Sequence, residues 1–134
     1  MSNYSQKKWL SIAIALNIII SLGHYLHNMA FLPEYREPSW ITPALIDSLW
    51  LAMTPFSILG YVFFCRNRLL LSYSFLYLYC GLSLLVLGHY AITPIWTLSL
   101  EINAIIWAEA IAALILAAYT FSLQRRSRYN VTTS

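Results

Sequence analysis

Four long apolar stretches, separated by short polar segments, dominate the sequence. They run from about Trp9 to Phe31, Pro43 to Cys65, Leu69 to Tyr90 and Asn103 to Leu123. Each is close to the roughly 20 residues that an α-helix needs to cross a bilayer. Alternation of polar and apolar residues with a period of two, typical of barrel strands, is absent. The pattern predicts an all-α integral membrane protein with four transmembrane helices.

Short polar connections join these stretches. Pro33–Pro38 separates the first stretch from the second, and Arg66–Arg68 separates the second from the third. Thr42 followed by Pro43 is typical of an N-cap and a first-turn proline. Because short connections favour antiparallel neighbours, the sequence predicts a compact four-helix bundle.

The composition excludes the other broad classes of protein. Hydrophobic residues make up 60% of the 134 residues and charged residues only 10%, whereas a soluble domain carries about 25% charged residues. This argues against both a soluble globule and a disordered chain. The net charge of +3 does not indicate nucleic-acid binding, because the cations sit in small clusters. We expect residues 1–134 to form a single transmembrane domain.

The distribution of cations predicts the orientation. If all four spans are real, seven of the eight Lys and Arg residues lie on one side: Lys7, Lys8, Arg66, Arg68, Arg125, Arg126 and Arg128. Only Arg36 lies on the other. The positive-inside rule then places both termini and the basic tail 124–134 in the cytoplasm. We expect a multi-pass protein of a bacterial-type inner membrane or a plasma membrane.

Polar residues form a stripe along the first stretch. Asn17, Ser21, His24, His27 and Asn28 recur at spacings of three and four, which places them on one face of a helix. Because polar groups in hydrocarbon are costly, this face is expected to point into the bundle.

Small residues recur every seven positions in the third stretch, at Ser74, Gly81 and Gly88. Small residues on one face allow two transmembrane helices to approach closely. We therefore expect a neighbouring helix to pack against this face.

Histidines and carboxylates converge on the outer half of the protein. The orientation places every one of them there or in the outer connections: His24, His27, His89, Glu34, Glu37, Asp47, Glu101 and Glu109. Glu109 is the deepest, roughly 12 Å below Glu101 at the rise of an α-helix. The cytoplasmic half contains no acidic residue. The convergence predicts a polar site at the extracytoplasmic side.

A four-residue similarity relates two of the histidines. Leu22–Tyr25 reads Leu-Gly-His-Tyr and recurs as Leu87–Tyr90. An internal duplication would place His24 and His89 at equal depth across a pseudo-twofold axis. The alternative is chance similarity between two hydrophobic helices.

A metal ion is the first candidate ligand of this site. His24, His27 and His89 could bind it together with the carboxylates Asp47 and Glu101. Imidazole and carboxylate ligands suit Zn, Fe or Mn. The alternative is a cluster of interfacial histidines without a ligand, in which the loop carboxylates face the outer water.

Haem is the second candidate, which we rank below a metal ion. His24 and His89 could be its axial ligands, and the neighbouring Gly23 and Gly88 would leave room for a flat macrocycle. Only Arg36 is available at this side to meet the haem propionates.

Glu109 supports a different hypothesis, because a carboxylate inside a span is a candidate for proton coupling. It would serve a small transporter or a quinone-linked protein. Alternatively, Glu109 contributes only a hydrogen bond to Tyr61, Thr54 or a histidine. The chain would then be an accessory or assembly subunit with no cofactor of its own. Besides the lipid bilayer, a second copy or a membrane-complex partner is expected. No sequence motif of a known enzyme class decides whether the protein is an enzyme.

Overall fold

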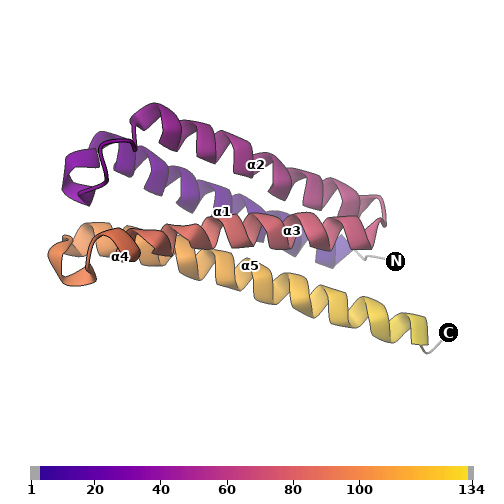
Figure 1. Ribbon diagram of the computed structural model, residues 1–134. Helices are drawn as coiled ribbons and strands as arrows, with labels where there is room; N and C mark the ends of the chain where they lie inside the picture. Colours follow the sequence, from indigo (N-terminus) through magenta and orange to yellow (C-terminus); the bar gives the residue numbers. More distant parts are fainter. Residues whose placement is uncertain (1–3, 133–134) are drawn as a thin grey trace.

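The computed structural model of the protein describes the backbone of residues 4–132 and the side chains of residues 4–127 (Figure 1). The described part is all-α and contains no strand. Four long helices carry the fold: α1 (Tyr4–Ala30), α2 (Pro43–Cys65), α3 (Leu69–Leu84) and α5 (Leu100–Thr132). Short helical segments join them: η1 (Leu32–Tyr35), η2 (Leu85–Gly88), α4 (His89–Ile92) and η3 (Ile95–Thr97).

Four helical segments are long and apolar enough to cross a membrane, which confirms the predicted number. They are Tyr4–Ala30, Pro43–Cys65, Leu69–Ile92 and Leu100–Ser127. The second has the predicted bounds, and the hydroxyl of Thr42 caps it by accepting a hydrogen bond from the amide of Leu45. The last helix continues as far as Thr132, so the region expected to be a basic tail is helical up to that residue.

The third predicted helix is not one continuous α-helix. It is α-helical only to Leu84, tightens into the 3-10 turn η2, and resumes as α4 at His89. A 3-10 stretch within a helix rotates the residues that follow it relative to a regular α-helix. The interruption therefore sets the direction in which His89 points.

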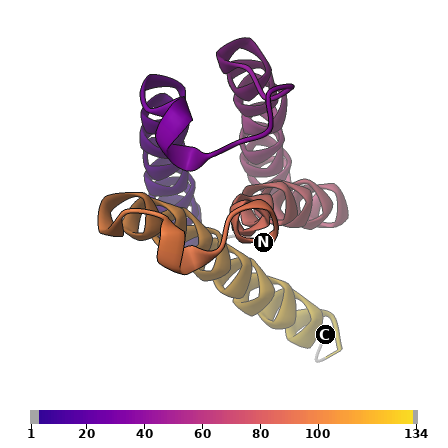
Figure 2. The ribbon, with the colours of Figure 1, turned by 60° about the vertical axis from the view of Figure 1, so that its left-hand side comes forward.

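The two ends of the bundle differ. We call the end formed by the connections 31–42 and 93–99 the loop end. The start of α1 and the end of α5 lie at the opposite, terminal end, as does the connection 66–68 (Figure 1). Near the terminal end, α2 and α3 are in close contact, whereas toward the loop end they diverge (Figures 1 and 2).

A glycine on α2 makes the close contact between α2 and α3 possible. A Cβ atom at Gly60 would lie 2.7 Å from the Leu76 side chain. The hydroxyl of Ser72 also donates a hydrogen bond of 2.7 Å to the Gly60 carbonyl oxygen. The expectation that the small residues of the third stretch serve this purpose is wrong. Gly81 and Gly88 are exposed, and a Cβ atom at either would meet nothing within 4 Å.

The polar face of α1 points into the bundle, as the stripe predicts. Asn17, Ser21, His24 and Asn28 are all buried. On the terminal side of this stripe lies the main apolar core, which includes Leu10, Ile14, Leu76 and Leu116. A second apolar cluster surrounds Tyr35 at the loop end. The buried polar residues thus lie between two apolar layers.

Candidate functional site

The connection after α1 carries two residues of the site. Arg36 ends η1 in a left-handed conformation with φ 53°, which is uncommon for a residue with a side chain. The chain reverses here, so that Tyr35 and Glu37 both turn inward. The hydroxyl of Thr93 donates to the carbonyl oxygen of Tyr35 at 3.4 Å, which ties the connection to the segment after α4.

Each of the three histidines contacts a different carboxylate. His24 contacts Glu109 from α5 and His89 contacts Glu37, in both cases through Nδ1. The third pair joins His27 Nε2 to a Glu101 oxygen at 3.3 Å. The predicted convergence of histidines and carboxylates at one end is therefore present in the structure. Two carboxylates stay outside it, because Asp47 on α2 and Glu34 on η1 are exposed.

The deepest pair, His24 and Glu109, is almost completely buried, with side chains 3% and 1% exposed. Glu109 Oε2 contacts His24 Nδ1, and Glu109 Oε1 accepts a hydrogen bond of 3.0 Å from the hydroxyl of Ser83. The other ring nitrogen, His24 Nε2, is buried without a partner. A carboxylate at one nitrogen fixes the tautomer of an imidazole. The arrangement therefore leaves Nε2 free to accept a hydrogen bond or a proton.

Tyr35 lies among the three histidines. Its ring is 1% exposed, and its centroid is 5.4 Å from that of His89, 5.7 Å from His27 and 6.1 Å from His24. Burial, together with the nearby carboxylates, raises the pKa of its phenol. The hydroxyl therefore stays protonated and can donate a hydrogen bond to His27 Nδ1, which lies 2.8 Å away. The other ring nitrogen, Nε2, faces Glu101.

Glu37 is buried, contrary to the expectation that the loop carboxylates face water. Its side chain is only 3% exposed. Burial raises the pKa of its carboxyl group. While Oε1 contacts His89, Oε2 is buried without a partner. The carboxylate thus has an oxygen available for a further hydrogen bond.

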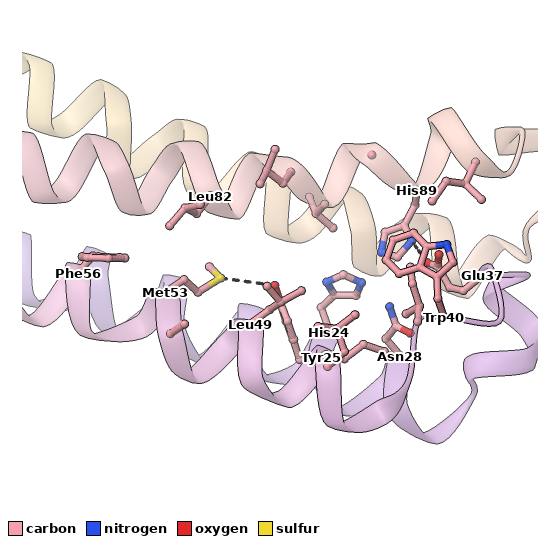
Figure 3. Close-up of a pocket in the computed structure, with 18 residues that line it drawn as sticks. His24, Tyr25, Asn28, Glu37, Trp40, Leu49, Met53, Phe56, Leu82 and His89 are labelled. Atoms are coloured by element: carbon pink, nitrogen blue, oxygen red, sulfur yellow. Dashed lines mark hydrogen bonds and ion pairs between the residues drawn. The ribbon is translucent and has the colours of Figure 1, made fainter.

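Beside these pairs, a cavity of about 360 Å³ lies between α1, α2 and the α3–η2–α4 segment (Figure 3). One end of the cavity is polar, with His24, Asn28, Glu37 and His89 in its wall. Apolar side chains line the rest, among them Leu45, Leu49, Met53, Phe56 and Leu82. Figure 3 shows Glu37 and His89 at one end of the cavity, beside Trp40, and Phe56 at the other end, where the labelled side chains are apolar. The cavity has the polarity of an amphiphilic molecule.

Several residues that line the cavity are exposed at the surface of the bundle, on α2 and on the η2–α4 segment. Leu49 and Ala52 of α2 are exposed, and so are Leu85 and Ile92. All four are apolar or small. This part of the cavity lining is therefore apolar at the surface of the bundle.

The structure brings most of the sequence-predicted site residues together, but not as a metal centre. His24 and His89 are neighbours, with ring centroids 5.4 Å apart. Among the described residues, however, no group of three or more His, Cys, Asp or Glu is arranged to hold a metal ion. Metal binding is therefore not supported. Sequence reasoning missed Tyr35, Ser83 and the inward turn of Glu37.

No protein-family profile, curated protein or solved structure matches this chain. Its function is therefore argued from the geometry of the site.

Proposed function

We propose that this protein is a membrane protein that binds an amphiphilic small molecule in the cavity between α2 and α4. The polar head of the ligand donates hydrogen bonds, as a hydroxyl or amine group does. Its apolar tail lies along α2 and α3. The observation that carries the proposal is the polarity of the cavity, which is polar at one end and apolar over the remainder.

The polar end supports a head group that donates hydrogen bonds. Three of its atoms are buried without a partner: His24 Nε2, Asn28 Oδ1 and Glu37 Oε2. Oxygens of carboxylates and amides accept hydrogen bonds, as does the free nitrogen of a neutral imidazole. A buried acceptor without a partner costs free energy. A bound hydroxyl or amine would therefore remove this cost.

The apolar part supports an alkyl or similarly apolar tail. It extends along α2 from Leu45 to Phe56, which is about 16 Å at the rise of an α-helix. The volume of the whole cavity, about 360 Å³, falls within the range of roughly 300–1,000 Å³ that small-molecule pockets have. Burial of apolar surface would supply most of the binding free energy.

The positions of the Lys and Arg residues indicate the side of the membrane from which the ligand would enter. If both termini are cytoplasmic, as the positive-inside rule indicates, the loop end faces the outside. The ligand would then enter from the outer leaflet, between α2 and α4. Self-association and a partner in a membrane complex stay predictions from the sequence.

Thermal unfolding of the purified protein in detergent tests the proposal. A ligand that binds only the folded state raises the Tm. We expect dodecanol and dodecylamine to raise it, because both donate hydrogen bonds. Dodecane has no head group, and dodecanoate only accepts hydrogen bonds, so neither should raise the Tm comparably.

Two variants show whether the effect arises in the cavity. Ala52→Trp adds a large ring to the cavity lining and should abolish the response to dodecanol. Leu114→Trp adds the same ring to an exposed position of α5, where the side chain is 53% exposed, and should leave the response intact. Equal responses to all four compounds, or an unchanged response in Ala52→Trp, would overturn the proposal.

A further inference from the structure

A second group of buried polar side chains lies outside the cavity, on the terminal side of Glu109. It consists of Asn17 and Ser21 on α1 and Tyr79 on α3, with exposures of 1%, 0% and 0%. None of the three lines the cavity. Their polar atoms have no hydrogen-bond partner among the described residues. These atoms are the amide nitrogen and oxygen of Asn17 and the hydroxyl oxygens of Ser21 and Tyr79.

Helical spacing places these side chains next to the His24–Glu109 pair, on its terminal side. Ser21 precedes His24 by about 4.5 Å along α1, and Tyr79 precedes Ser83 by about 6 Å along α3. Both helices run toward the loop end (Figure 1).

The helix opposite contributes a small side chain to this layer. One turn beyond Glu109, α5 carries Ala113, which is fully buried. An alanine fills far less volume than the polar side chains that face it from α1 and α3. The layer thus combines a small side chain with buried polar groups that lack partners, and such groups are the partners that a buried water molecule requires.

The next layer toward the terminal end is closed and apolar. Ile14, Leu76 and Leu116 lie one helical turn beyond Asn17, Tyr79 and Ala113, and all belong to the main core. Polar groups in hydrocarbon must find partners inside the protein. The layer between this core and Glu109 therefore needs partners that the described side chains do not supply.

We propose that this layer binds a short file of water molecules. The water bridges Asn17, Ser21 and Tyr79 and connects them to Glu109, which forms the loop-side end of the file. At its other end, the apolar core stops it near the middle of the bundle. Glu109 would then have a hydrated environment on one side only, and proton exchange through the file could not reach the terminal end.

Solid-state NMR with magnetisation transfer from water tests the proposal in lipid bilayers. We expect transfer to the side-chain amide of Asn17 and to the ring of Tyr79. Ile14 and Leu116 serve as internal controls, since the apolar layer should receive none. Absence of transfer to Asn17 and Tyr79 would overturn the proposal.

A substitution supplies a second, independent readout. If water binds the Tyr79 hydroxyl, Tyr79→Phe removes a hydrogen bond and lowers the Tm. If no water binds the hydroxyl, the same change removes a buried polar group that has no hydrogen-bond partner and raises the Tm. Tyr77→Phe, which removes a 3.0 Å hydrogen bond to Gln124, gives the size of the loss for a bond made within the protein.

A bound cation is the competing occupant, because hydroxyl and amide oxygens also bind Na⁺. Unfolding measured in NaCl and in choline chloride at equal ionic strength separates the two. Water predicts the same Tm in both salts. A Tm that rises with Na⁺ in the wild-type protein, but not in Tyr79→Phe, would overturn the water file in favour of a cation site.

Discussion

Glu109 lies directly against His24 although 85 residues separate them in the sequence. The contact joins the first long helix to the last, in the most buried part of the site. Ser83 from α3 completes it by donating to the second carboxylate oxygen. Three helices thus share one hydrogen-bonded group, and its energetics should dominate the stability of the loop end.

Removing one partner of this pair should cost more than removing both. Glu109→Leu leaves His24 buried without its carboxylate and should lower the free energy of unfolding by roughly 3–5 kcal/mol. The double variant His24→Leu, Glu109→Leu replaces the pair with apolar groups and should regain most of that loss. Chemical unfolding in detergent gives both values. Strictly additive losses would show that the pair is not coupled.

The exposed pair should behave differently from the buried one. Glu101 is 74% exposed where it contacts His27. Water and salt screen such a contact, so Glu101→Gln should lower the free energy of unfolding by less than about 1 kcal/mol. The loss should shrink further at high salt. A loss comparable with that of Glu109→Leu would contradict the exposure.

Glu37 should make stability depend on pH in the acidic range. Because burial raises the pKa of its carboxyl group above the ordinary value, the folded state binds more protons than the unfolded state just above pH 4.5. The contribution of Glu37 to stability is therefore fully present below this pH and is lost as the pH rises through the raised pKa.

The matched variant for this prediction is Glu37→Gln, which removes the titration but keeps the shape. The difference in Tm between the wild-type protein and Glu37→Gln should change across this window in favour of the variant as the pH rises. Parallel pH profiles of the two proteins would contradict a buried Glu37.

Gly60 should tolerate no side chain. A Cβ atom there would lie 2.7 Å from Leu76, which is itself fully buried, and overpacking of this kind costs roughly 1–3 kcal/mol. Gly60→Ala should therefore lower the free energy of unfolding. Gly81→Ala, where the added atom meets nothing within 4 Å, should instead gain about 0.5–1 kcal/mol from helix propensity. Similar effects at both positions would show that α2 and α3 are not in tight contact.

The long helices could be predicted because each corresponds to an apolar stretch of about the length that an α-helix needs to cross a bilayer. The polar stripe of α1 was equally predictable, since Asn17 and His24 cannot face lipid without cost. The length of the apolar stretches and the inward orientation of polar faces also predict that the histidines and most of their carboxylates lie at one end. Both features depend on spacing along the chain, which the sequence records directly.

The rest of the site depends on features that do not follow from the spacing of residues along the sequence. Glu37 turns inward because Arg36 adopts a left-handed conformation, and nothing in the local sequence demands this of an arginine. The 3-10 turn before His89 likewise follows no recognisable pattern. Ser83 is one of several serines in an apolar helix, and only the position of Glu109 singles it out.

The order of the helices has a consequence for biogenesis. If the helices insert into a membrane as proposed, α1 enters it with His24 before α5 brings Glu109, because the chain is synthesised from its N-terminus. In the meantime, the polar face of α1 has to be shielded by something other than its final partner, such as the insertion machinery or water. The bundle can close only when the last helix arrives, so a ribosome that stalls before α5 would leave an unfinished chain marked by an unpaired histidine.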